Sequence, residues 1–155
     1  MSAVTPNFWP ADAEDTQATK YYVKAGAAAS IKAGDIVLQN TGGDDNYVVA
    51  AGTQVVNTDD AKIVGVAATT SDDTASADGT VMIYDDVDTK YIGRPLSTGD
   101  VAATIRLTGV TVDSAATGVQ TVKLADTTKP VVTVLDYDDN NNITFRFIRS
   151  AFFGA

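Results

Sequence analysis

β-Branched residues dominate this chain and constrain its fold more than any other feature. Valine occurs 19 times and threonine 21 times, whereas leucine occurs five times. β-Branched side chains favour extended backbone, because their χ1 rotamers are restricted in a helix. Of the 20 acidic residues, 19 are aspartate, which favours turns and caps, and one is glutamate, Glu14. The composition therefore predicts an all-β domain with many turns.

Short alternating or apolar runs, separated by turn signals, fill the chain from Lys20 onward. The loops TGGDD (41–45) and DDNNN (138–142) each predict a hairpin. This spacing is typical of a small β-barrel or β-sandwich of short antiparallel strands. We expect strands over residues 21–25, 35–40, 46–51, 62–68, 80–86, 90–94, 101–112, 119–125, 131–137 and 143–150.

Residues 1–19 differ from the rest, which we treat as a single β-domain over residues 20–155. The segment shows no strand or helix periodicity, and it holds Pro10 and the one tryptophan of the chain, Trp9, beside Phe8. It is either a disordered terminus or an extended arm that orders on contact with a partner. Adjacent large aromatics favour the arm, because such residues dominate binding hot spots. We therefore expect Phe8, Trp9 and Pro10 to bind a partner.

The composition also excludes several function classes. The chain contains no cysteine and no histidine, so disulfides, thiol chemistry and His-dependent nucleophilic triads are ruled out. The net charge of −9 argues against nucleic-acid binding, which needs clustered Lys and Arg. No apolar run approaches the length of a membrane span, and the N-terminus lacks the pattern of a secretory signal. We expect a protein made in a cytoplasm, without a cofactor, that is not an enzyme.

The loop DYDDNNN (136–142) is the strongest candidate for a ligand site. Asp136, Asp138 and Asn140 present spaced oxygen atoms that suit calcium. The EF-hand pattern fails, however, because Asn141 stands where glycine is needed and Phe147 where glutamate is needed. Asp and Asn are equally typical of a hairpin turn, which is the interpretation we favour, with no metal.

Other aspartates also lie in expected loops. Four Asp-Asp pairs begin at residues 44, 59, 72 and 85, and paired carboxylates serve glycoside hydrolysis when they flank a cleft. No aromatics cluster around these pairs in sequence, so solvated loop charges are the preferred interpretation. Gly34 and Asp35, and likewise Asp78 and Gly79, are expected to form structural turns that lead into strands.

The C-terminal segment SAFFGA leaves one question open. Phe152 and Phe153 stand close to the end of the chain. They either cap the barrel or take part in a contact between subunits.

Three short motifs lie in order within residues 20–86. They are Ala33-Gly34-Asp35-Ile36-Val37, Ile63-Val64-Gly65-Val66-Ala67 and Thr74-Ala75-Ser76-Ala77-Asp78-Gly79-Thr80-Val81. Together they resemble the turn-and-strand pattern of capsid decoration (cement, or head-stabilisation) proteins of tailed bacteriophages. The C-terminal half carries no motif that matches this group.

The resemblance implies a structural virion protein that binds the outer surface of a phage capsid and stabilises the expanded head. Its partners would be the major capsid protein and further copies of itself, with a trimer favoured. Two other functions remain open. One is a tail or fibre component, and the other is a calcium- or carbohydrate-binding β-module.

Overall fold

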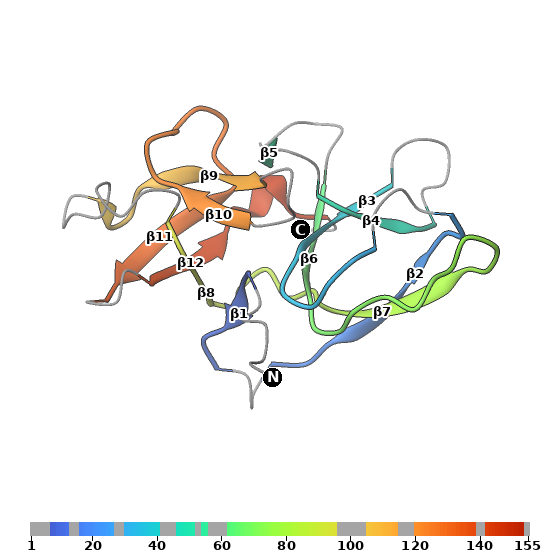
Figure 1. Ribbon diagram of the computed structural model, residues 1–155. Coiled ribbons are helices and arrows are strands. Elements are labelled where there is room, and N and C mark those ends of the chain that lie inside the picture. Colours follow the sequence, from blue (N-terminus) through green and yellow to red (C-terminus); the bar gives the residue numbers. More distant parts are fainter. Residues whose placement is uncertain are drawn as a thin grey trace, which may run out of the picture.

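The computed structural model shows an all-β protein built from two antiparallel sheets (Figure 1). It describes residues 7–12, 16–26, 30–40, 46–51, 54–55, 62–95, 105–114, 120–138 and 142–153. One sheet has seven strands and the other five, and they pack in a sandwich-like arrangement without forming a closed barrel. The expected all-β class is confirmed, and of the two architectures the sandwich is the one observed.

The five-stranded sheet forms the right-hand part of Figure 1 and comes from residues 19–84. Its order is β2 (Thr19–Val23), β7 (Gly79–Tyr84), β6 (Ile63–Ala67), β3 (Ile36–Gln39) and β4 (Val48–Ala50). The predicted hairpin across residues 41–45 is confirmed by the antiparallel pairing of β3 with β4. The sheet curls enough that its edge strands, β2 and β4, lie close to each other. The curl encloses a small apolar cluster: Val23, Ile31, Val37, Val48, Val64, Ala67, Val81 and Ile83.

The seven-stranded sheet lies on the left of Figure 1. Its order is β1 (Trp9–Pro10), β8 (Tyr91–Gly93), β12 (Ile143–Phe147), β11 (Val132–Tyr137), β9 (Gly109–Ser114) and β10 (Gln120–Lys123), and β5 (Gln54–Val55) also pairs with β9. β11 and β12 form the second predicted hairpin, with a register shift between Val134 and Asp136.

The larger apolar core lies between the two sheets. Buried and partly exposed residues alternate along β11 and β12, as expected for strands with one face in a core. From the other sheet, Ile36, Ile63 and Val66 reach the same core. β6 is therefore buried on both faces, and it connects the two clusters.

Two predicted strand boundaries are wrong. The expected strand over 101–112 begins at Gly109, because a turn precedes it in which Leu107 has a left-handed φ of 61°. The Leu107 N–H donates to the Val134 carbonyl at 2.7 Å, which fixes this turn on β11. The expected strand over 143–150 ends at Phe147, and the 3₁₀ helix η3 (Arg149–Ala151) follows it. Residues 101–104 lie outside the described residues.

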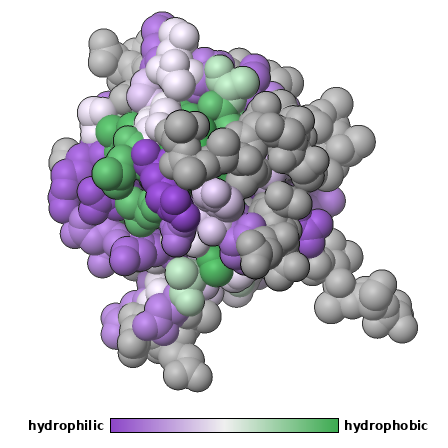
Figure 2. Space-filling model, turned by 90° about the vertical axis from the view of Figure 1, so that its left-hand side faces the viewer, coloured by the Kyte–Doolittle hydropathy of each residue, from purple (hydrophilic) through white to green (hydrophobic). Residues whose placement is uncertain are grey.

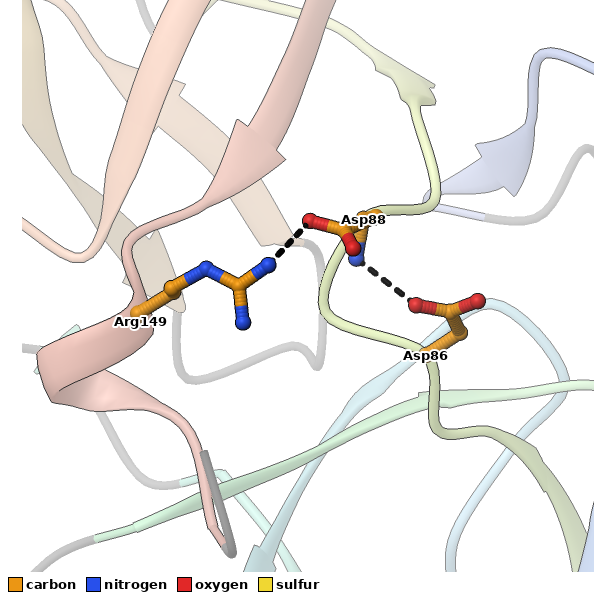
Figure 3. Close-up of polar contacts among 3 residues, drawn as sticks. All are labelled: Asp86, Asp88 and Arg149. Carbon is orange, nitrogen blue, oxygen red and sulfur yellow. Dashed lines mark hydrogen bonds and ion pairs between the residues drawn. The ribbon is translucent and has the colours of Figure 1, made fainter.

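The acidic segment between β7 and β8 connects the sheets. β7 belongs to the five-stranded sheet and β8 to the seven-stranded sheet, so this segment is a crossover rather than a hairpin turn. Its local shape comes from the Asp88 N–H, which donates to Asp86 Oδ1 at 2.9 Å (Figure 3). Arg149 Nη2 also donates to Asp88 Oδ1 at 2.8 Å, which ties the crossover to η3.

Candidate functional site

Of the predicted partner-binding residues, Trp9 and Pro10 form β1, a strand that the sequence did not predict, and Phe8 directly precedes it. β1 pairs with β8, with Trp9 opposite Ile92 and Pro10 opposite Tyr91. Phe8 is 1% exposed, and Pro10 is also buried. Phe8 and Pro10 are therefore not exposed anchors, which corrects that prediction. Residues 1–6 and 13–15 lie outside the described residues.

Phe8 is buried because the seven-stranded sheet offers it a closely fitting slot. Its ring meets the Phe145 ring edge to face, with centroids 5.3 Å apart. Gly93 forms the floor of the slot, since a Cβ at this position would overlap the Phe8 ring. The Phe8 N–H donates to the Gly34 carbonyl at 3.1 Å, so the segment also contacts the other sheet.

Trp9 remains accessible, and its neighbours define a surface. It lies between two buried residues, so its side chain is on the opposite face of β1, where it is partly exposed. Trp9 pairs with Ile92, and Ile92 pairs with Thr144 of β12. Of the three predicted partner-binding residues, Trp9 is thus the one that a partner can reach, and it lies on the face of the seven-stranded sheet turned away from the core.

Gly34 and Asp35 form a turn that joins three segments. Gly34 has φ of 92°, and its N–H donates to the Ala67 carbonyl at 2.7 Å. The Asp35 carboxylate accepts from the Lys32 N–H and from Asn7 Nδ2, each at 3.0 Å. Burial raises the pKa of Asp35, and these two hydrogen bonds partly oppose the shift. The turn therefore holds the N-terminal segment against β3 and β6.

Asp78 and Gly79 form the turn before β7. Asp78 Oδ1 accepts from the Ala25 N–H and Oδ2 from the Tyr47 hydroxyl, each at 2.8 Å. These donors lower the pKa of Asp78, the Ala25 N–H having the larger effect. Ala25 follows β2 and Tyr47 precedes β4, so this carboxylate bridges the two edges of the curled sheet. A side chain on Gly79 would overlap the backbone of Asp73.

The three motifs that carry the resemblance form one continuous unit. Each motif forms or leads into one of β3, β6 and β7, which are neighbours in the middle of the five-stranded sheet. The pairing of β6 with β7 itself runs through Ile83 and Tyr84, just beyond the third motif. At the centre of the second motif, Gly65 has φ of 157°, and a Cβ there would collide with the Tyr84 carbonyl and lie 2.8 Å from Ile83 Cγ2. Glycine is required at this position because β7 approaches so closely.

The loop proposed as a calcium site has other partners for its carboxylates. Asp136 Oδ1 accepts from Arg106 Nε at 2.9 Å, and this pairing lowers the pKa of Asp136. Asp138 accepts from the backbone N–H and the side-chain amide of Asn142. Asn140 lies outside the described residues. Within the described part of the chain, no group of three or more acidic residues could hold a metal ion.

The described Asp-Asp pairs fix local structure. Asp72 Oδ1 accepts from the Thr80 N–H, and Asp73 Oδ1 from the Ser71 hydroxyl, each at 2.6 Å. The pairs at 44–45 and 59–60 lie outside the described residues.

Asp85 has a different kind of partner, a tyrosine of β2. Its Oδ2 accepts from the Tyr21 hydroxyl at 2.8 Å. Burial, followed by this hydrogen bond, raises the pKa of Tyr21 to about 12. The bond ties the end of β7 to its neighbour β2.

The two C-terminal phenylalanines have different environments. Phe152 is 5% exposed and packs on Phe147, with ring centroids 5.6 Å apart, so it belongs to the main core. Phe153 is 45% exposed, although its N–H donates to the Ile63 carbonyl at 2.7 Å. The segment thus connects both sheets, and of the two rings it is Phe153 that stays accessible.

Comparison with family models, with curated proteins and with solved structures finds no match to this chain. Among the described residues, no helix is both long and apolar enough to cross a membrane.

A structural residue that the sequence did not reveal is Gln120. Its Oε1 accepts from the Ile36 N–H at 2.7 Å, and Gln120 is 3% exposed. This bond joins β10 of one sheet to β3 of the other. No local pattern marks Gln120, because its partner is 84 residues away in sequence.

Proposed function

We propose that this chain is a structural virion protein that binds the outside of a bacteriophage capsid and stabilises the expanded head. The observation that carries the proposal is the gathering of the three resembling motifs into one unit. Residues 33–37, 63–67 and 74–81 are separate in sequence, yet each forms or leads into one of three neighbouring strands, β3, β6 and β7. Three motifs that meet in one part of the fold are less readily explained as a chance resemblance than three motifs scattered over the structure.

The organisation of the described residues is consistent with a passive binding role. The described aspartates that resembled candidate sites accept hydrogen bonds from backbone amides, tyrosines or arginines of this chain. These bonds stabilise turns and join strands. Carboxylates used in this way suit a decoration protein, which reinforces a shell through the contacts of many copies with neighbouring coat subunits.

Co-sedimentation of the full chain with expanded capsids and with unexpanded procapsids of its phage tests the proposal. Saturable binding to expanded shells, without binding to procapsids, is the expected result. Absence of binding to either shell would contradict the proposal and favour a tail or fibre component. Deletion of residues 1–19 is unsuitable for this test, because it also removes Phe8 from the core.

A further inference from the structure

Charge is distributed unevenly along this chain. Residues 1–88 contain 14 acidic and four basic residues, whereas residues 89–155 contain six acidic and seven basic residues. The five-stranded sheet lies wholly within the acidic segment, and most of the seven-stranded sheet lies within the other. All four arginines are in residues 89–155. The segments that connect the strands of the five-stranded sheet therefore carry most of the acidic residues within 1–88.

Two basic residues flank the partly exposed Ile92 on β8. Lys90 and Arg94 are exposed, and each is separated from Ile92 by one buried residue. Alternate residues of an extended segment point to the same side, so all three lie on the face turned away from the core. The Ala11 N–H donates to the Lys90 carbonyl at 2.8 Å, which extends the pairing of the N-terminal segment along β8.

A third basic residue lies on the same face in the neighbouring strand. Arg146 is exposed between two buried phenylalanines of β12, and Thr144, two residues earlier, pairs with Ile92. Trp9 pairs with Ile92 from the other side. We call Trp9, Lys90, Ile92, Arg94 and Arg146 the outer face. Figure 2 views the molecule from the left-hand side of Figure 1, where the seven-stranded sheet lies, and hydrophobic side chains reach the surface there among hydrophilic ones.

The cations of the outer face are available to a partner. Among the residues that the structure describes, none forms an ion pair with Lys90, Arg94 or Arg146. The exposed carboxylate of β11, Asp136, is already paired with Arg106. The outer face thus combines an aromatic ring, an aliphatic side chain and three cations that form no ion pair with any described residue.

We propose that the outer face is the surface that contacts the coat shell, and that the shell presents carboxylates around an apolar patch there. This inference rests on the proposed function. Arginine forms strong, directional hydrogen bonds with carboxylates, and tryptophan is among the residues that dominate binding energy. The five-stranded sheet, with its acidic connecting segments, then points away from the shell, because complementary charge orients a protein as it docks.

An acidic protein surface fits the outer face better than a nucleic acid. Proteins that bind duplex DNA strongly neutralise roughly 6–10 phosphates, whereas the outer face offers three cations. The net charge of −9 also repels a long polyanion.

Charge reversal at one cation on each sheet tests this orientation. Arg146→Glu changes the outer face, and Lys20→Glu makes the same charge change on β2 of the five-stranded sheet. We expect Arg146→Glu to weaken binding to expanded capsids about tenfold or more, and Lys20→Glu to change it less than about twofold. Trp9→Ala should weaken binding as well, while thermal melts verify that each variant folds. Added salt should weaken wild-type binding more than binding of Arg146→Glu.

The outcomes separate this inference from the proposed function. If the wild-type protein binds neither shell, the proposed function fails and this inference with it. If the wild-type protein binds and Arg146→Glu binds equally well, the function stands and the inference is overturned. Equal losses for Arg146→Glu and Lys20→Glu also overturn it. A change in oligomer size with Arg146→Glu, at unchanged capsid binding, would assign the outer face to a second copy of the chain instead.

Discussion

The core beneath the seven-stranded sheet contains five aromatic rings, whereas the buried cluster described within the five-stranded sheet is aliphatic. The rings of Phe8, Tyr91, Phe145, Phe147 and Phe152 form a continuous set of contacts, with successive centroids 5.3–6.0 Å apart. The aliphatic cluster is smaller, and it is surrounded by turns whose backbone amides donate to aspartates. One region is held mainly by packing, and the other adds many polar contacts to a thin core.

The partners of the aspartate carboxylates also differ between the two regions. Around the five-stranded sheet, Asp35, Asp72 and Asp78 accept from backbone N–H groups. Around the seven-stranded sheet, Asp88 and Asp136 pair with exposed arginines. Exposed ion pairs contribute little to stability, whereas a carboxylate that satisfies turn amides fixes backbone geometry. Backbone N–H groups also donate to carboxylates around the seven-stranded sheet, at Asp126 and Asp138, so the exposed arginine pairs are what distinguishes that region.

Phe145→Ala should have the largest effect, because Phe145 contacts three other rings of the aromatic core. We expect a loss of about 3–5 kcal/mol in the free energy of unfolding, measured by urea denaturation. Phe153→Ala is the matched control, since Phe153 is 45% exposed, and its loss should stay within about 0.5 kcal/mol. Similar losses for both variants would contradict the importance assigned to the aromatic core.

Gln120→Leu tests the connection between the two regions. The variant leaves the Ile36 N–H without its acceptor in a buried position, which should cost about 1–3 kcal/mol. Thr121→Leu, at the next and partly exposed position of β10, controls for the change in side-chain size. Hydrogen exchange of β3 and β10 provides the measurement, and protection should fall on both strands. If protection falls on β10 alone, the bond does not couple the sheets.

Asp78→Asn should produce the smallest effect, and this effect should depend on pH. The pKa of Asp78 is lowered in the folded state, so the stability it contributes is present above its ordinary pKa, about 4, and is lost as pH falls through the folded value. Urea denaturation across the acidic range should show a flatter pH dependence for the variant than for the wild-type protein. The pKa of Asp35 is raised in the folded state, so its contribution to the free energy of unfolding falls as pH rises, opposite to that of Asp78. An unchanged pH profile in Asp78→Asn would show that the bridge between β2 and β4 is not held by charge.

The sequence predicted local structure well where one strand and its own turn supplied the signal. The hairpins β3–β4 and β11–β12 form as expected, because adjacent segments with alternating patterns pair across short loops. The turns at Asp35 and Asp78 also have the expected structural role. The prediction for Phe8 was wrong, because its slot is made by Gly93 and Phe145, which are distant in sequence. Alternation within residues 1–19 was too short to reveal β1.

By itself, the sequence determined the all-β class and most strand positions, because rotamer restriction, alternation and turn chemistry act over a few residues. Tertiary structure decided which sheet each strand joined. The acidic segment after β7 resembles a hairpin turn, yet it carries the chain from one sheet to the other. Tertiary structure also decided that Phe8 is buried while Trp9 stays accessible, and that Arg146 of β12 lies on the same sheet face as Trp9. Such outcomes depend on contacts between residues far apart in the chain, whose free energy no local pattern encodes.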